Sequence, residues 1–562
     1  MKKLFAILSV VILAAGCNFL DFDETSGDYT REDMYSTFSN VKAMMTNVYG
    51  YMPDKDITGV SSAMRECGCD DAEYADPDAS VQLFGNGNWS AISTVDTKWD
   101  LYNAIRSANE FLESIKTVDL SIYQYDIKYD NQMAQMALYP YQARVLRAFY
   151  LFELARRYGD IPIPEKMLTI EEANSIPKTP FDQVIDFIVK ECDECAAVLP
   201  KSYMSTELDN DFGRVTKGFA MALKSRALLY AASPLHNPTG DTAKWKAAAK
   251  AALDLINENM YSLDPNFLND IVGSSEVIFC IMRSEDGSFE KYNFPVRFTY
   301  GRRTSMAGSY PTQNLVDAFQ TLGGYDITLG ANGWQTNDPD FDITKPYDGR
   351  DPRFARTILA NGMAFKGSTI ETYVGGQDYS ATRSGLCTVT GYYLKKFVNP
   401  ETSFVREDEH EFKHQRVVFR YAEILLSYAE AANECLGPDA TDAELTLSAR
   451  EALNRVRANA TMPAVTVVKA SDAGAFREAV QREWRVEFAF EDHRFWDVRR
   501  WKIASTTQTQ INGVDIVKEG NNFQYSLKNV ETRTWAEKMY LYPIPQSELF
   551  CNPNLNPQNT GW

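Results

Sequence analysis

Residues 482–501 read REWRVEFAFEDHRFWDVRRW and combine a dense charge pattern with aromatic side chains. Five charged residues recur three, four or seven positions apart, which places them on one predicted helix: Glu483, Glu487, Arg494, Asp497 and Arg500. Exposed pairs at this spacing form ladders of ion pairs worth about 0.3 kcal/mol each. Every acid has an arginine within helical reach, which keeps it ionised and unsuited to act as a general acid. The stretch therefore predicts a structural helix rather than a pair of glycosidase carboxylates.

Six further stretches carry apolar side chains at helical spacing. They are residues 142–158, 181–199, 219–233, 245–256, 420–434 and 443–458. Turn residues separate the members of each successive pair, so each pair is predicted to be antiparallel. Alanines recur where the helices must approach closely, and helix pairs of this length resemble tetratricopeptide repeats. The pairs lack a fixed period of about 34 residues, which predicts a degenerate array rather than a regular solenoid.

Two zones, residues 53–98 and 260–415, have few helical stripes and many Gly, Asn, Asp, Thr and Tyr residues. Short alternating runs at Glu276–Phe279 and Tyr392–Val398 predict small strands between long loops. Loops of this length are uncommon unless they carry binding function. We therefore expect a mostly α fold of degenerate tetratricopeptide-like helix pairs with a loop-rich, mixed α/β capping region, and a ligand site in these two zones.

The N-terminus predicts an exported lipoprotein. Lys2 and Lys3 precede an apolar run, Leu4–Ala15, which is too short for a membrane span and fits a secretory signal. The sequence LAAGC, ending at Cys17, resembles a bacterial lipobox, in which the cysteine is lipidated and the chain is cut before it. Residues 1–16 are thus the predicted signal peptide and residues 17–33 an anchor with an acidic tether, which resembles a surface-export signal. The alternative is a plain signal peptide followed by an incidental cysteine.

Composition excludes several classes of function. The chain has 562 residues and a formal charge of −19, which repels phosphate backbones and argues against nucleic-acid binding. The sequence has no second apolar run of about 18 residues, so it does not predict an internal membrane span. The eight cysteines after Cys17 are too sparse for a disulfide-stapled scaffold. Cys192 and Cys195 form a C-x-x-C inside a helical stripe without a second pair, so we expect buried thiols rather than a zinc site.

One motif has the form of an enzyme signature. Residues 410–414, HEFKH, match the H-E-x-x-H metalloprotease helix, with His410 and His414 as ligands and Glu434 as a possible third. The surrounding sequence, REDEHEFKHQRVVFR, is strongly charged, whereas a catalytic zinc helix is normally apolar around its ligands. The run after His414 also reads as extended chain. A zinc hydrolase is therefore the minor alternative, and we expect no metal, no cofactor and no enzymatic activity.

Several segments together resemble one protein family. REWRVE and EDHRFWDVRRW resemble the R-x-E-R…E…E-G-x-R-x-x-D-L-x-R-W signature of the SusD/RagB family of nutrient-binding outer-membrane lipoproteins, with Asp492 where the family usually has glycine. The ending YLYPIPQSELFCNPNLNPQNTGW is similar to the family's closing motif, with Thr560 in place of the usual proline. Residues 99–112, 157–164 and 420–434 also fit. With the lipobox, these segments span the chain in the expected order.

The resemblance implies a fold and a function. Residues 34–562 would form a single domain, with a helical scaffold mainly in residues 34–52, 99–260 and 418–505. The protein would be a lipid-anchored, surface-exposed protein of the outer membrane that captures an oligosaccharide. It would deliver this ligand to a SusC-like, TonB-dependent transporter. A peptide-capturing relative, as in the RagB branch, is the alternative within the binding class.

Candidate ligand residues follow from the chemistry of sugars. A sugar ring packs its C–H face on an aromatic plane, and its hydroxyls pair with planar polar side chains. The loop-rich zones supply such residues: Asp71, Tyr74, Asn88, Trp89, Tyr300, Arg302, Arg303 and Trp334. Trp89 and Trp334 lie among Gly and Asn, outside any helical stripe. We expect both rings to be exposed and to form one binding surface with Asp71 and Arg303.

Overall fold

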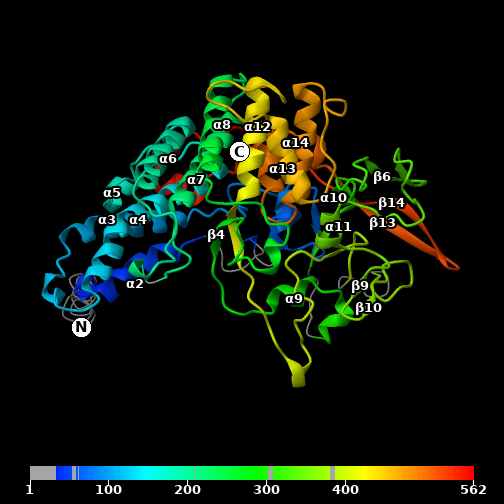
Figure 1. The fold of residues 1–562 in the computed structure, drawn as a ribbon, viewed down its shortest axis with the longest axis horizontal. Coiled ribbons are helices and arrows are strands. Elements are labelled where there is room, and N and C mark those ends of the chain that lie inside the picture. The colour runs from blue at the N-terminus through cyan, green and yellow to red at the C-terminus, as the bar shows by residue number, and fades with distance from the viewer. Residues whose placement is uncertain (1–32, 53–58, 61–62, 209, 302–307, 380–386) are drawn as a thin grey trace, which may run out of the picture.

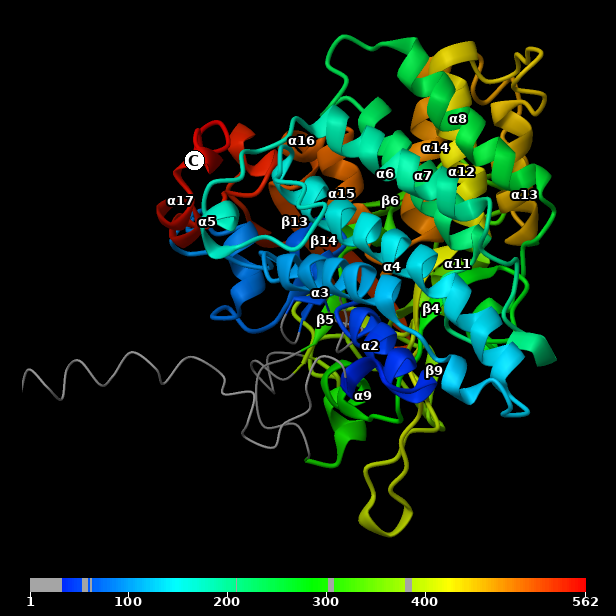
Figure 2. The same ribbon diagram turned by 90° about the vertical axis from the view of Figure 1, so that its left-hand side faces the viewer.

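A row of packed helices forms one side of the molecule, and short strands and loops form most of the other (Figure 1). The computed structural model describes residues 33–52, 59–60, 63–208, 210–301, 308–379 and 387–562. The row consists of α2 (Phe38–Tyr49), α3 (Leu101–Ser114), α4 (Tyr129–Tyr158), α6 (Phe181–Ala196), α7 (Lys217–Ala232), α8 (Thr242–Asn257), α12 (Tyr421–Leu436), α13 (Ala449–Asn459) and α14 (Ala473–Glu487). Each of these helices packs against the next, and Figure 2 shows α2, α3, α4, α6 and α7 side by side. The fold is mostly α with a mixed capping region, as the sequence predicts.

The predicted helix pairs are confirmed. Helices α4 and α6, α7 and α8, and α12 and α13 pack as the three expected pairs. Helix α7 begins after Thr216, whose hydroxyl accepts a hydrogen bond from the Phe219 backbone N–H and satisfies a free helix donor. Ala249 and Ala252 on α8 are fully buried, which lets the neighbouring helices approach closely. Helix α4 begins at Tyr129, well before the predicted start at residue 142. Its first turns give no sequence signal because they are partly exposed and lack an apolar stripe.

A long segment lies between two helices that touch. Helices α8 and α12 pack directly on each other, although residues 258–420 separate them in the sequence. The chain leaves the row through β4 (Val277–Ile281) and returns through β12 (Arg416–Arg420), and these two strands pair antiparallel. Residues 282–415, here called the excursion, are therefore tied together at their base beside the helical row (Figure 1).

The two predicted loop-rich zones are joined in the structure. Strand β3 (Ala72–Tyr74), from the first zone, pairs antiparallel with β5 (Ser309–Pro311), from the second. The excursion contains further short strands and helices: α9 (Ser288–Asn293), α10 (Gln313–Val316), β6 (Ile327–Gly330), β7 (Gly333–Thr336), α11 (Pro352–Thr357), β8 (Ile358–Leu359), β9 (Ala364–Phe365), β10 (Ser368–Thr369) and β11 (Tyr393–Leu394). The predicted strand at Tyr392–Val398 is reduced to β11, because the chain turns at Phe397, where φ is 64°.

The structure contains a long hairpin that was not predicted from the sequence. Strands β13 (Gln510–Glu519) and β14 (Asn522–Thr532) pair antiparallel and turn at Gly520, which has φ of 62°. The hairpin follows the short helices α15 (Arg494–Arg500) and α16 (Ala504–Thr507) and precedes α17 (Gln546–Cys551), and it projects from the molecule in Figure 1. Ile511, Val514 and Ile516 are buried, so alternating apolar residues before a glycine turn were the signal for it.

The prediction of one continuous helix over residues 482–501 is wrong. Helix α14 ends at Glu487 and α15 begins at Arg494, and the chain turns between them through left-handed Phe490 and Asp492. The predicted exposed ladder is also wrong, because Glu483 and Asp497 are buried. Glu483 is paired from distant segments, by Arg353 at 2.6 Å and Arg457 at 2.8 Å.

Asp492 shows why glycine suits this position in the signature. Its φ is 65°, a conformation that glycine adopts freely and aspartate tolerates better than most residues. Its carboxylate pairs with Arg65 at 2.6 Å and with Arg416 at 3.0 Å. Burial acts to raise the pKa of Asp492, but these arginines outweigh it and hold the pKa well below its usual range. Asp492 thus adds ion pairs that glycine would lack.

Some predictions concern residues outside the described ranges. The signal peptide, Cys17 and nearly all of the tether, residues 17–33, lie there, so the anchor stays a prediction. Within the described ranges, no helix is long and apolar enough to cross a membrane. Cys192 and Cys195 are buried free thiols, as expected.

Candidate functional site

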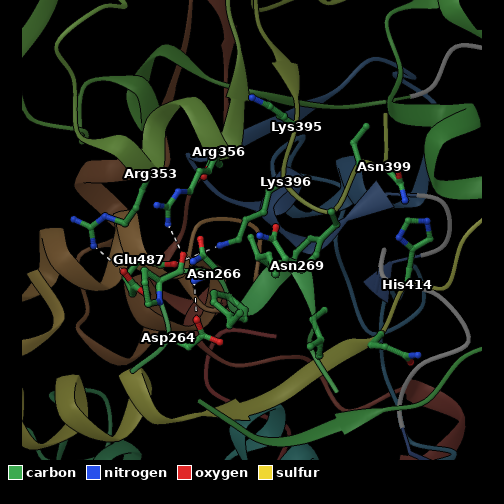
Figure 3. Close-up of a pocket in the computed structure, with 18 of the residues that line it drawn as sticks. Asp264, Asn266, Asn269, Arg353, Arg356, Lys395, Lys396, Asn399, His414 and Glu487 are labelled. Atoms are coloured by element: carbon green, nitrogen blue, oxygen red, sulfur yellow. Dashed lines mark hydrogen bonds and ion pairs between the residues drawn. The ribbon is translucent and has the colours of Figure 1, made fainter. Parts of the chain in front are cut away.

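A pocket of about 660 Å³ opens where the excursion meets the helical row (Figure 3). Four segments far apart in the sequence line most of it: the chain after α8, helix α11, the turn after β11 and the lead-in to β12. The ends of α13 and α14 contribute Asn459 and Glu487. The pocket lies mainly within the second predicted loop-rich zone, but none of the six predicted ligand residues that the structure describes lines it.

One wall of the pocket is fixed by paired charges. Arg353, on α11, donates to Asp351 at 2.7 Å, Glu483 at 2.6 Å and Glu487 at 2.8 Å. Burial acts to raise the pKa of Glu487, but Arg420 and Arg353 outweigh it and lower the pKa to about 2. Glu487 therefore remains ionised at neutral pH and is fully engaged by arginines.

Arg420, just before α12, continues this network towards the helical row. Its guanidinium pairs with Glu276 at 2.6 Å, Glu487 at 2.7 Å and Glu491 at 2.8 Å. Lys396, from the turn after β11, also pairs with Glu491 at 2.6 Å. Because Glu276 directly precedes β4 and Arg420 ends β12, the network holds the base of the excursion in place.

A buried carboxylate positions the opposite wall. Glu290, on α9, is fully buried and accepts hydrogen bonds from the Asn399 backbone N–H at 2.8 Å and from His414 Nε2 at 3.0 Å. Figure 3 shows Asn399 and His414 on the same side of the pocket. One side chain thereby ties the turn after β11 to the lead-in of β12.

The rim carries cations that lack a carboxylate partner among the described residues. Arg356 donates to the Pro265 carbonyl at 2.7 Å, and Lys395 Nζ donates to the Ala355 carbonyl at 2.7 Å. Lys413 is exposed. Burial lowers the pKa of Lys395. These cations differ from Arg353 and Lys396, which the network already neutralises.

Amide and aromatic groups complete the lining. Asn266 and Asn269 are exposed and follow α8, and Asn459 is half-buried. Phe397 is half-buried, with φ of 64°, a strained conformation for a bulky residue that tends to occur at functional sites. The pocket thus offers one partly exposed aromatic ring beside several hydrogen-bond donors, a combination suited to a polar ligand with an apolar face.

The H-E-x-x-H segment does not form a metalloprotease helix. His410 lies on irregular chain, bridged to Ser403, and its ring contacts Phe412. His414 is buried against Glu290 rather than one helical turn from His410. Over the part of the chain that the structure describes, no three His, Cys, Asp or Glu side chains are grouped to hold a metal ion.

The prediction that Trp89 is exposed is wrong. Its side chain is only 3% exposed and packs edge-on against Phe84, Tyr542 and Trp562, with ring centroids 5.0, 4.8 and 5.0 Å away. The polar neighbours of Trp89 in the sequence are not its neighbours in space. Trp89 is therefore a core residue.

Trp334 is also buried, in a different aromatic cluster. It packs edge-on against Tyr347 and Tyr525, and Arg350 lies over its ring. The two tryptophans share no ring contact, so the predicted joint surface is absent.

The other predicted ligand residues are divided between core and surface. Asp71 is fully buried and pairs with Arg485 at 2.7 Å, and burial raises the pKa of its carboxyl group. Tyr74 is buried in β3. Asn88 and Tyr300 are exposed, so their roles stay predictions, whereas Arg302 and Arg303 lie outside the described residues.

The residues of the pocket left only weak signals in the sequence. Lys395-Lys396-Phe397 follows a short predicted strand, and Arg353 and Arg356 are spaced to share one face of a helix. Neither pattern is distinctive alone, because paired and unpaired cations look alike in a sequence.

Comparisons with known proteins place the chain in a family. Residues 275–562 match the SusD family, and residues 18–229 match a family described as starch-binding and associating with the outer membrane. SusD-like protein P2 of Formosa agariphila is 24% identical over the full length of both chains. SusD-like protein P25 of the same organism is 23% identical over 93% of this chain and 92% of its own.

Solved structures agree in fold. A SusD-like protein from Bacteroides fragilis superposes with a TM-score of 0.76 at 28% identity, covering 94% of this chain and 98% of its own. A SusD-like carbohydrate-binding protein from the same species gives a TM-score of 0.72 at 25% identity, covering 93% of this chain and all of its own. Since the first family match alone spans slightly more than half of the chain, the protein belongs to the SusD family.

Proposed function

We propose that the protein is a surface lipoprotein of the outer membrane that binds an oligosaccharide in the pocket and passes it to a SusC-like, TonB-dependent transporter. Family membership supports this role, as does the carbohydrate-binding relative with the same fold. The observation that carries the proposal is the pocket itself. Its charged wall is rigid and internally paired, whereas its rim leaves amides, cations and the Phe397 ring available to a ligand.

The proposed role is capture rather than catalysis. The carboxylates that face the pocket are engaged: Glu487 by two arginines, and Asp264 by the Asn266 backbone N–H and the Ser274 hydroxyl. A glycosidase needs one carboxyl group that holds a proton near neutral pH. The low pKa of Glu487 does not meet that need.

Binding is expected to depend on Phe397. Replacing Phe397 by alanine removes the aromatic face of the pocket, and loss of such a contact is worth about 2 kcal/mol, or about thirtyfold in affinity. We would measure binding by affinity electrophoresis in gels containing individual polysaccharides, and confirm it by calorimetry.

Tyr300→Ala is the matched control, since Tyr300 is an exposed aromatic residue from the sequence-based prediction. Unchanged affinity in Phe397→Ala together with weakened binding in Tyr300→Ala would move the site to the surface around Tyr300.

Anchoring is expected to depend on Cys17. Replacing Cys17 by alanine removes the thiol that would carry the lipid, so the protein should leave the outer-membrane fraction and escape labelling by surface antibodies. Cys551→Ala, which removes an exposed thiol near the C-terminus, is the control. Continued surface display of Cys17→Ala would contradict the lipoprotein assignment.

A further inference from the structure

The charge of the pocket rim is opposite to that of the protein. The chain carries a formal charge of −19, yet Arg356, Lys395 and Lys413 line the same pocket without a carboxylate partner among the described residues. The one carboxylate of the lining that no described cation pairs is Asp264, which the Asn266 backbone N–H and the Ser274 hydroxyl already hold. The rim therefore has a local excess of positive charge.

Two of these cations come from segments that contact each other. Lys395 Nζ donates to the carbonyl of Ala355, which directly precedes Arg356 on α11. Figure 3 shows both residues in the upper part of the pocket, with the Lys395 amine and the Arg356 guanidinium pointing in different directions. The Arg356 guanidinium is exposed, so it retains donors that the Pro265 carbonyl does not occupy. Helix α11 and the turn after β11 thus each contribute one cation to the lining of the pocket.

Partial burial of Lys395 disfavours its charged form, and a bound anion would stabilise that form. The pKa of Lys395 is lowered by desolvation, and no nearby carboxylate opposes this effect. Lys396, beside it in the chain, differs because Glu491 partly offsets its burial. An anionic group bound at Lys395 would favour its charged form, so binding and protonation would be coupled.

We propose that the pocket is selective for acidic oligosaccharides, whose carboxylate or sulfate groups contact Arg356 and Lys395. This inference rests on the proposed function. The planar Arg356 fork suits either of these oxyanions, Lys395 adds a point charge, and Phe397 receives the apolar face of a sugar ring. Arg353 and Lys396 do not contribute, since the buried glutamates already neutralise them.

The test compares matched acidic and neutral sugars on the full-length lipoprotein. The probes are polygalacturonate and its methyl ester, and chondroitin sulfate with desulfated chondroitin and desulfated, carboxyl-reduced chondroitin, presented as an array at low salt. We expect an acidic member to bind at least tenfold more tightly than its neutral counterpart, and we expect added NaCl to reduce the difference. Binding of polygalacturonate identifies a carboxylate, whereas binding of chondroitin sulfate that is lost with desulfated chondroitin, which keeps its carboxylates, identifies a sulfate.

Variants locate the effect. Arg356→Gln with Lys395→Gln should weaken binding of the acidic member at least tenfold relative to binding of the neutral member, so that the preference for the acidic member disappears. Proton uptake on binding, measured by calorimetry at alkaline pH in buffers of different ionisation enthalpy, should disappear in Lys395→Gln. Lys250→Gln with Arg455→Gln, which removes two exposed cations on other helices, is the charge-matched control and should keep the preference.

Three outcomes would contradict the inference, and they differ in whether they also contradict the proposed function. Equal binding of neutral and acidic members refutes acidic selectivity and leaves the proposed function intact. A preference that survives in the double variant refutes the role of Arg356 and Lys395. Failure of every saccharide to bind refutes both the inference and the proposed function.

Discussion

Replacing Arg420 by methionine is expected to lower the free energy of unfolding by about 3–5 kcal/mol, because it leaves buried carboxylates without their partner. Arg420 is 1% exposed and pairs with Glu276, Glu487 and Glu491. Arg353 and Lys396 still reach Glu487 and Glu491 in the variant, but Glu276 has no other cation among the described residues. Chemical denaturation monitored by circular dichroism measures the loss.

The pH dependence of this loss identifies its cause. In the native protein Glu487 has a pKa of about 2 and stays ionised well below neutral pH. Burial already raises the pKa of Glu276, and removing Arg420 would raise it further. The variant can therefore relieve the cost by binding a proton, so its deficit should shrink from about pH 7 to about pH 5.

The control for Arg420→Met is Arg477→Met. Arg477 pairs with Glu434 near the surface, where an ion pair is worth less than about 1 kcal/mol. A deficit in Arg420→Met that does not change with pH would contradict the electrostatic explanation and indicate a loss of packing instead.

Replacing Trp89 by alanine is expected to destabilise the protein by about 3–5 kcal/mol, because it opens a large cavity in the core. The ring packs against residues from the C-terminal segment, Tyr542 and Trp562, as well as Phe84. The variant should lose several degrees in Tm, and the fraction that remains folded should bind ligand normally. This expectation reverses the one from sequence, which placed the ring at the surface.

Phe550→Ala is the control for Trp89→Ala, because Phe550 is a large aromatic residue of the C-terminal segment that is 77% exposed. Its Tm should change little. An unchanged Tm in Trp89→Ala, combined with weaker ligand binding, would restore the surface assignment for Trp89.

Sequence reasoning succeeded where the determinants are local. The stripes of α4, α6, α7, α8, α12 and α13 arise from spacing within one helix, and the turns between them limit each helix to a nearby partner. The resemblance to the SusD/RagB family likewise rests on short motifs read directly from the chain.

The candidate site was less predictable because its determinants are distant in the sequence. Glu483 is predicted from the sequence to join an exposed ladder of charges on its own helix, but its partners are Arg353 and Arg457. The same spacing that permits a local ladder also permits burial against arginines of other segments. Only the tertiary structure distinguishes a local ladder from burial against distant arginines. It also distinguishes Arg353, which is paired with carboxylates, from Arg356, which has no carboxylate partner among the described residues.

The aromatic residues show the same limit in another form. The Gly and Asn residues around Trp89 favour a loop at this point of the chain. The Trp89 ring is nevertheless buried, because Tyr542 and Trp562 from the C-terminal segment pack against it. A polar loop can therefore deliver a core side chain, and loop composition alone does not identify a binding surface.

The direct packing of α8 on α12 also constrains the order in which the chain can fold. Helices α2 to α8 can associate as soon as they are made, because each packs on a neighbour close in sequence. The face of α8 that receives α12 stays uncovered until residues 258–420 have been synthesised. Contacts across so long a separation form slowly, and an uncovered apolar helix face is prone to aggregate. The excursion thus delays completion of the helical row beside it.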